Sequence, residues 1–446
     1  MKSTSARLAW RCKTSKPYDL QLVNLDAGSK ESFHYKAKTQ HVATMVGLTP
    51  GTGYRWSISF LRNAEAAITG EFTTLPKNPN RSFAVLGHTH GTEKFGHFPD
   101  TLFASTVEGS NPQFVVHTGD CVYHSTPANW NEHFFMVFQS ILESAPIYIA
   151  PGNHDSGWPF IDGLDLRPFK ELFPHDYPDE SKNSTGSAYY DLVEGPIHFL
   201  FLSYVTELQV GSPQYRWISE TLDSSTSAFK VVVLGGMNNY YDKQSLRSLL
   251  ALKEVDAVLR GDGGAPKNIY SMPSNYPIFT VGSGGIGSPP WLYVTATPEH
   301  LTFLELNASG NPKRAHWIHS KRVRKEVTPL PQPTVTGDQV HRRFSFALPA
   351  SVSSNKINGI QFIVEGVPAN SITYSSKIRP KTRLGHGEVG FISQPGLLPK
   401  SGGVITIPIH SERPIRGGPY EINRISLELS GKPLGDQLRV TKVWLY

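Results

Sequence analysis

Three short apolar runs in the middle of the chain each end in a loop of polar and glycine residues. The runs are residues 83–86, 114–116 and 147–150, and the loops after them read Gly87-His88-Thr89-His90, Gly119-Asp120-Cys121-Val122-Tyr123 and Gly152-Asn153-His154-Asp155. Apolar runs of this length, separated by helical stretches, are typical of an α/β layered domain. Such proteins place their active sites in the loops beyond the carboxyl ends of strands. These three loops are therefore the candidate site.

The same part of the chain predicts a further strand and a helix. Residues 231–234 form a fourth apolar run, and a helix fits residues 127–144, with Thr126 as N-cap and Pro127 at its first position. One face of this helix carries four apolar side chains, Trp130, Phe134, Phe138 and Ile141. Because their spacing is helical, we expect this face to be buried in the core.

Segments with strand-like alternation flank this domain on both sides. Within residues 8–75, the segment 48–54 (LTPGTGY) resembles the tyrosine corner of fibronectin type III domains, in which the tyrosine hydroxyl bonds to backbone upstream. After a proline-rich linker at residues 329–333, alternation returns and predicts a second β-sandwich. The predicted domains are residues 1–76, 81–325 and 334–446.

Composition excludes several classes of protein. The 446 residues are 39% hydrophobic and 18% charged, as in globular chains, and the net charge of +6 is too small to predict a nucleic-acid partner. No apolar run approaches the roughly 18 residues of a membrane span, and the first residues lack the apolar core of a secretory signal. Cys12 and Cys121 fall in different predicted domains, so we expect no structural disulfide.

The order of these motifs resembles that of the calcineurin-like metallophosphoesterases, and in particular the purple acid phosphatases, over roughly residues 8–310. Besides the Gly-Asp motif with Tyr123 and the Gly-Asn-His-Asp motif, the segments 189–199 (YYDLVEGPIHF) and 281–285 (VGSGG) carry the resemblance. It implies a fibronectin type III-like β-sandwich at 1–76 and a four-layer α/β metallophosphoesterase domain at 81–325. Together with the C-terminal β-sandwich that the alternation predicts at 334–446, the chain is expected to be multidomain.

The resemblance also implies roles for individual residues. In purple acid phosphatases two metal ions share an aspartate, which corresponds to Asp120, and together they activate the water that attacks phosphorus. Tyr123 corresponds to a ligand of the first ion and Asn153 to a ligand of the second. His154 corresponds to the general acid that protonates the leaving group.

Four positions depart from the family pattern. His88 stands where the first loop of the family has an aspartate, and Asp262 replaces a histidine ligand. The other two histidine ligands correspond to Gly236 and Gly264, which have no side chain to bind a metal. Each metal site has thus lost one imidazole, and the remaining donors are usually too few for tight binding. We therefore expect a degenerate metal site in which His154 is a vestigial general acid. We also expect that no cofactor is bound and that the protein is a pseudoenzyme.

The alternative is a site for a single ion. His88, His90 and Asp120 form a two-histidine, one-carboxylate set, which suits one divalent transition metal ion such as Fe, Zn or Mn. Simpler metallophosphoesterases use a histidine at the position of His90. The alternative function is therefore a metal-dependent phosphoesterase, similar to acid phosphatases, with a single or altered metal site.

For a pseudoenzyme, we expect a structural or binding role outside the cell or in the periplasm, because the relatives are mostly exported. The expected partners are proteins, or further copies of the chain, bound through the β-sandwich domains. Carbohydrate binding by the C-terminal domain is a third hypothesis. Residues 7–12 match the second strand of the family's N-terminal domain, so we expect the first strand to lie upstream or to be donated by another subunit.

Overall fold

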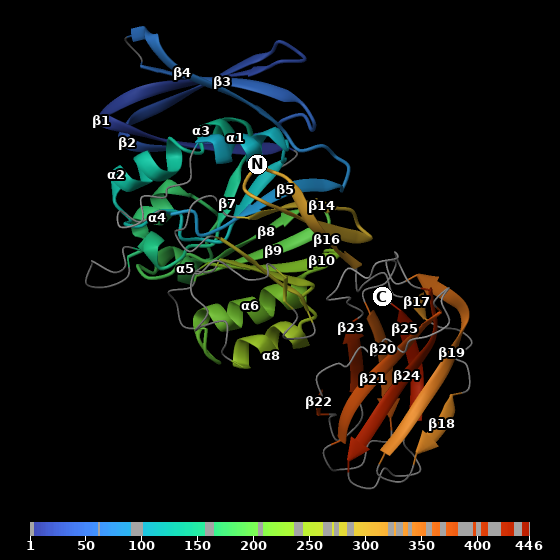
Figure 1. Cartoon of the computed structure of the whole chain (residues 1–446). Coiled ribbons are helices and arrows are strands. Elements are labelled where there is room, and N and C mark those ends of the chain that lie inside the picture. Colours follow the sequence, from blue (N-terminus) through green and yellow to red (C-terminus); the bar gives the residue numbers. More distant parts are fainter. Residues whose placement is uncertain are drawn as a thin grey trace. The chain divides into compact units, whose positions relative to one another are not determined.

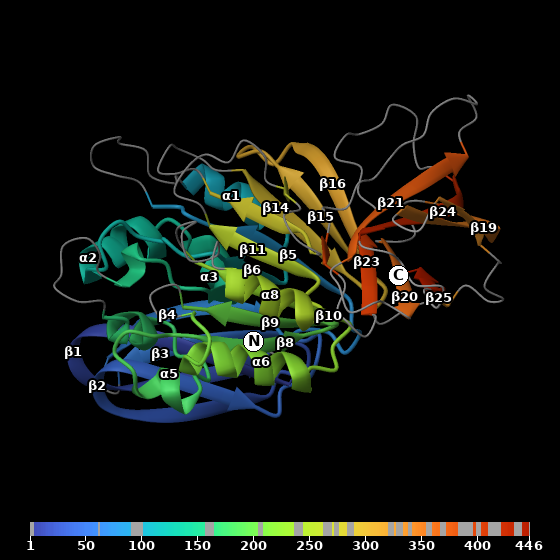
Figure 2. The same ribbon diagram turned by 90° about the horizontal axis from the view of Figure 1, so that it is seen from below.

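The computed structural model of the chain is shown in Figures 1 and 2. It separates into two compact units, Met1–Pro298 with Thr302–His316, and Glu299–Leu301 with Trp317–Tyr446. The structure describes residues 4–60, 63–90, 101–156, 165–203, 208–235, 244–261, 270–271, 276–282, 290–319, 325–326, 333–337, 341–353, 359–365, 372–381, 396–397, 403–408, 421–431 and 439–445.

The chain begins with a four-stranded antiparallel sheet of order β2-β1-β3-β4. Its strands are β1 (Ser5–Asn24), β2 (Lys30–Val46), β3 (Gly53–Phe60) and β4 (Asn63–Thr73). The Tyr54 hydroxyl accepts a hydrogen bond from the backbone N–H of Thr49 at 2.9 Å, as the predicted tyrosine corner requires. A fibronectin type III-like arrangement of this region in two sheets stays a prediction.

Two six-stranded sheets follow. The first has the order β16-β15-β14-β5-β6-β7 and the second the order β12-β13-β11-β10-β9-β8. The strands of the first sheet are β5 (Arg81–Leu86), β6 (Phe114–His117), β7 (Ile147–Ile149), β14 (Trp291–Ala296), β15 (His300–Leu306) and β16 (Pro312–His319). Those of the second are β8 (Tyr190–Glu194), β9 (Ile197–Leu202), β10 (Phe229–Leu234), β11 (Ala257–Gly261), β12 (Tyr270–Ser271) and β13 (Ile278–Val281).

Helices cover the outer face of each sheet. Side chains of α1 (Thr101–Gly109), α2 (Pro127–Trp130), α3 (Gln139–Ser144) and α4 (Arg167–Leu172) share a core with the first sheet. Those of α6 (Pro213–Ser224) and α8 (Gln244–Leu252) share a core with the second. The described part of this domain also contains the short α5 (Asp179–Asn183) and a 3-10 turn, His154–Ser156.

The apolar strands pack on both faces. In β5, Ala84 and Leu86 belong to the core under the helices, whereas the ring of Phe83 lies 5.4 Å from Phe199 on the second sheet. Successive side chains of a strand point to opposite faces, so an apolar run without alternation fits a strand buried on both sides. The result is helices, sheet, sheet, helices, which confirms the predicted four-layer α/β domain.

The predicted helix at 127–144 is interrupted. Thr126 caps it as expected, accepting from the N–H of Asn129 at 3.2 Å, and its four apolar residues are buried. A π-helical segment, Asn131–Phe135, separates α2 from α3. The wider π turn allows both Phe134 and Phe135 to contact Phe173, at ring distances of 5.9 and 6.1 Å.

The second unit contains two antiparallel sheets. Their orders are β17-β25-β20-β23 and β18-β19-β24-β21-β22. Their strands are β17 (Lys325–Glu326), β18 (Thr334–Gly337), β19 (His341–Ser353), β20 (Gly359–Glu365), β21 (Ile372–Lys381), β22 (Gly396–Leu397), β23 (Gly403–Pro408), β24 (Glu421–Gly431) and β25 (Arg439–Leu445). The predicted strands are confirmed, and their packing as a sandwich stays a prediction. Among the helices in the described part of the chain, none has the length and apolar character that crossing a bilayer requires.

A loop of the α/β domain contacts the N-terminal sheet. Arg7 of β1 donates to the carbonyl oxygen of Pro174 and pairs with Asp176 at 2.8 Å. Between these residues, the His175 ring stacks on Tyr190 with centroids 3.9 Å apart. Burial lowers the pKa of His175 to about 3, and nearby positive charges, Arg7 among them, act in the same direction.

We predict that His175→Phe makes the protein more stable in acid. The folded state disfavours the protonated ring, so stability is lost as the pH falls from about 6.5, the pKa in the unfolded chain, towards 3. Phenylalanine keeps the stacking and removes the titration, which should raise the unfolding free energy at pH 4 by roughly 1–3 kcal/mol relative to wild type. Urea unfolding at pH 7 and pH 4 measures the free energy of unfolding of both proteins. If this free energy falls equally between pH 7 and pH 4 in wild type and in His175→Phe, the prediction is wrong.

Candidate metal centre

The three predicted loops meet at one edge of the first sheet. Strands β5, β6 and β7 are parallel neighbours, with Leu86 level with His117 and His117 level with Ile149. The carboxyl ends of the three strands therefore lie side by side. The His88 N–H donates to the Gly119 carbonyl at 2.9 Å and the His90 N–H to the Asp120 carbonyl at 3.2 Å, so backbone bonds join the first loop to the second.

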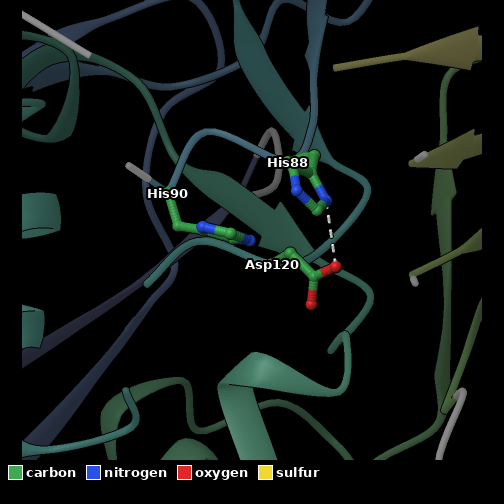
Figure 3. A group of neighbouring side chains, drawn as sticks. All are labelled: His88, His90 and Asp120. Atoms are coloured by element: carbon green, nitrogen blue, oxygen red, sulfur yellow. Dashed lines mark ion pairs between the residues drawn. The ribbon is translucent and has the colours of Figure 1, made fainter. Parts of the chain in front are cut away.

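His88, His90 and Asp120 converge in this place. Each offers a ligand atom, and the three atoms lie within 4.8 Å of one another. All three residues are buried, and Nδ1 of His88 lies 3.1 Å from Oδ2 of Asp120. Figure 3 shows the two imidazoles directed towards the carboxylate from the first loop. The structure thus places together the three residues predicted for a single ion.

The backbone at this cluster is strained. His88 and Asp120 have φ angles of 48° and 54°, in the left-handed region that residues with a Cβ rarely adopt. Such a conformation costs of order 1–3 kcal/mol per residue and persists only where the surroundings impose it, most often at functional sites. The left-handed backbone conformation of His88 and Asp120 orients their side chains towards each other.

The remaining predicted residues that the structure describes lie next to this cluster. The His154 ring is 4.3 Å from that of His90 and stacks on Tyr123 at 4.9 Å. The N–H of His154 donates to Oδ1 of Asp120 at 3.1 Å. Asn153 is buried, and its Oδ1 has no hydrogen-bond partner among the described residues. A buried amide oxygen without a donor is costly, and a metal ion would satisfy it.

Asp155 organises the second and third loops, a role that the sequence did not reveal. It is fully buried and accepts the N–H groups of Asp120, Cys121 and Gly152 at 2.8, 2.8 and 2.9 Å. Burial and then the charge of Asp120 raise its pKa to about 7. The only signal was its place in the Gly-Asn-His-Asp motif, which says nothing about where its oxygens bind.

The charge balance of the cluster suits a cation. Burial alone would raise the pKa of Asp120, but the close approach of His88 and the nearby charges of His154 and His90 hold it well below its usual value. The carboxylate is therefore ionised. Burial lowers the pKa of His154, while Asp120 acts against this. A carboxylate beside imidazole nitrogens is a donor set that transition metals accept.

Gly236 and Gly264, where we expect the family's histidine ligands to be missing, and Asp262 lie outside the described residues. The ends of the strands that precede them are described. A Cβ added to Gly119 would lie 3.0 Å from Cα of Gly235, and one added to Gly261 would lie 2.7 Å from the carbonyl oxygen of Thr118. These ends of β10 and β11 therefore lie beside the loop of Asp120, on the side of the second sheet.

Comparison with known proteins identifies the domain. Residues 75–263 match the model of the calcineurin-like phosphoesterase family. The chain carries a metallophosphoesterase domain that is similar to those of purple acid phosphatases. It is 24% identical over 322 residues to purple acid phosphatase 22 of Arabidopsis thaliana, covering 65% of this chain and 70% of the relative.

Two further proteins are similar to this chain. Over 163 residues the chain is 28% identical to probable inactive purple acid phosphatase 9 of Arabidopsis thaliana, covering 30% of this chain and 24% of the relative. A purple acid phosphatase, PPD1, from yellow lupin (Lupinus luteus) seeds has a similar structure, with a TM-score of 0.57 over 72% of this chain and 74% of that one. At 14% identity this likeness shows the fold alone.

The expectation that the chain holds no cofactor is not supported. The family typically depends on two metal ions, and His88, His90 and Asp120 form a buried group of metal-ligating side chains. The orphaned oxygen of Asn153 fits the same conclusion. The residues present thus fit a metal ion.

We predict that Gly152→Ala is strongly destabilising, because a Cβ at this position would lie 2.1 Å from Oδ1 of Asp120. Relief of that clash must move the carboxylate or the third loop, at a cost of roughly 2–3 kcal/mol in unfolding free energy. Gly109→Ala is the matched control, because its Cβ would meet nothing within 4 Å, and it should change stability by less than about 1 kcal/mol. Similar denaturation midpoints for the two variants would show that the third loop is not tightly packed.

Proposed function

We propose that this site binds one divalent transition metal ion and that the chain has lost the two-metal hydrolysis of purple acid phosphatases. The observation that carries the proposal is the convergence of His88, His90 and Asp120, whose ligand atoms lie within 4.8 Å of one another. Two imidazoles and one carboxylate on a single face suit one ion such as Zn²⁺, Mn²⁺ or Fe²⁺ and leave positions open for further ligands.

Asn153 supports the same site as a fourth donor. The N–H of its neighbour His154 bonds to Asp120, so the backbone of the third loop is held against the second. Oδ1 of Asn153 is buried without a hydrogen-bond partner among the described residues, and an amide oxygen is a common ligand of divalent ions. The family resemblance gives this asparagine the same role.

The loss of two-metal chemistry rests on the sequence. Gly236 and Gly264 stand where the family has histidine ligands, one for each ion, and glycine offers no side-chain donor. A pair of ions activates the attacking water and stabilises both the attacking and the leaving oxygens of the ester. Removal of one imidazole from each site takes away the support for that pair.

A bound ion would supply a Lewis acid that attracts the oxygens of a phosphate ester. His154 keeps the position of the family's acid, and its Nδ1 lies 2.8 Å from the carbonyl oxygen of Tyr123. A carbonyl oxygen only accepts, so Nδ1 carries a proton and the neutral ring has its lone pair on Nε2. His154 can therefore donate a proton towards the site only as an imidazolium. Its retention favours the second candidate, a phosphoesterase that uses one ion.

We propose a non-catalytic biological role for the chain. A chain with two all-β regions beside a domain with reduced catalytic machinery is best explained as a binding or structural subunit, acting outside the cell as exported purple acid phosphatases do. The similarity to a relative named probable inactive purple acid phosphatase 9 supports a non-catalytic reading. The partners we propose are proteins, or further copies of the chain, with carbohydrate bound by the C-terminal domain as a weaker alternative.

We predict one tightly bound transition metal ion per chain after purification without chelator and incubation with Zn²⁺, Mn²⁺ or Fe²⁺ followed by desalting. His90→Ala removes an imidazole, and Asp120→Asn replaces the charged carboxylate of the cluster by a neutral amide, so each should lower the metal content several-fold. His133→Ala, outside the cluster, is the control. Two ions per chain would contradict the loss of the second site, and no ion in any preparation would contradict the site itself.

We predict no measurable hydrolysis of p-nitrophenyl phosphate between pH 5 and pH 7 with any of these ions. The comparison is Asp120→Ala, which removes the central carboxylate and sets the background rate. Turnover by the wild type that disappears in Asp120→Ala, and that falls in His154→Gln, would contradict the pseudoenzyme and establish the one-ion phosphoesterase.

A further inference from the structure

A second buried histidine lies behind the metal-binding cluster and links its first two loops. His117 is the last residue of β6 and is fully buried. Its Nδ1 lies 3.1 Å from the backbone nitrogen of Gly119, and its Nε2 lies 3.0 Å from Oγ1 of Thr89. Gly119 precedes Asp120, and Thr89 lies between His88 and His90. One imidazole therefore touches the residue next to every ligand of the cluster.

The two contacts fix the state of the ring. A backbone N–H only donates, so Nδ1 of His117 must be the acceptor in its bond with Gly119. The neutral ring then carries its single proton on Nε2, which donates to the Thr89 hydroxyl. The Cys121 sulfur, 3.3 Å from Nδ1, adds a weak donor on the same side. Burial lowers the pKa of His117 to about 3, in agreement with a neutral ring.

The bond to Thr89 bears on where the neighbouring side chains point. Thr89 is buried, with its hydroxyl turned to His117, while His88 and His90 reach the carboxylate of Asp120. The ring centroids of His88 and His90 are only 4.2 Å apart, so the two imidazoles share one side of the loop. Since His88 has a φ of 48°, local backbone preference does not favour this arrangement and an anchor must hold it.

We propose that His117 is a positioning residue, whose hydrogen bond to Thr89 holds the first loop so that His88 and His90 both face Asp120. The inference rests on the proposed metal site, because it assigns these two residues the task of preorganising the ligands of that site. Groups behind the ligands of a metal site commonly tune its affinity and geometry by 10- to 100-fold. Neither Thr89 nor His117 would touch the ion.

The test compares Thr89→Val with Thr89→Ser in the full-length chain. Valine has nearly the shape of threonine but no hydroxyl, whereas serine keeps the hydroxyl and loses a methyl group. Co²⁺ is the probe, and its visible absorption bands report both affinity and coordination geometry. We expect Thr89→Ser to bind within about threefold of wild type, and Thr89→Val to bind at least tenfold more weakly with a changed spectrum. Thr106→Val, on helix α1, is the control for the same substitution elsewhere.

The outcomes separate this inference from the proposed function. If wild type does not bind Co²⁺, the metal site is wrong and the positioning role falls with it. If wild type binds and Thr89→Val gives the same affinity and spectrum as Thr89→Ser, the site stands and the positioning role is overturned.

If Thr89→Val does not fold, two variants of His117 test the positioning role instead. His117→Gln places a donor near the position of Nε2 and keeps the bond to Thr89, whereas His117→Asn places its amide near Nδ1 and keeps only the bond to Gly119. Tighter Co²⁺ binding by His117→Gln than by His117→Asn supports the proposal, and equal binding overturns it.

Discussion

The candidate site depends on the hydrogen bonds that the buried carboxylate of Asp155 accepts. It is fully buried and accepts three backbone N–H groups, from Asp120, Cys121 and Gly152. These bonds hold the second and third loops together and help to impose the left-handed conformation of Asp120. A buried carboxylate without such partners would cost several kcal/mol, so the three donors and the acceptor stabilise one another. Removal of the Asp155 carboxylate would leave three buried donors unsatisfied and the ligand loop without its anchor.

The sequence predicted the elements that follow from local pattern. Apolar runs without alternation indicated buried strands, and the polar loops after them indicated the site, because parallel strands end at the same edge of a sheet. The interruption of the helix at Asn131–Phe135 was not predicted, since Phe134 and Phe135 both pack on Phe173, a contact that spacing alone does not reveal. Asp155 and His117 were missed for the same reason, because their roles depend on which backbone groups the fold brings to them.

In our proposal, the site combines retained and missing parts of a two-metal centre. The bridging position, Asp120, is kept with Tyr123, Asn153 and His154 around it, and His88 and His90 add two imidazoles from the first loop. On the side of the second sheet, Gly235 and Gly261 closely approach the loop of Asp120. Beyond them, the three positions that correspond to family histidines are Gly236, Asp262 and Gly264, and the two glycines offer no side-chain donor. Among the described residues, the donors therefore gather at the edge of the first sheet. That asymmetry is the physical reason to expect one ion in place of two.

Crystals grown with Zn²⁺ and measured at the zinc absorption edge test this account most directly. We expect a single anomalous peak per chain, within bonding distance of His88, His90 and Asp120, with Thr89 and His117 hydrogen-bonded to each other behind it. Two peaks about 3.5–4 Å apart would show that a two-metal centre survives without the missing histidines. No peak at the cluster, with zinc bound elsewhere or not at all, would contradict the metal site and the positioning role assigned to His117.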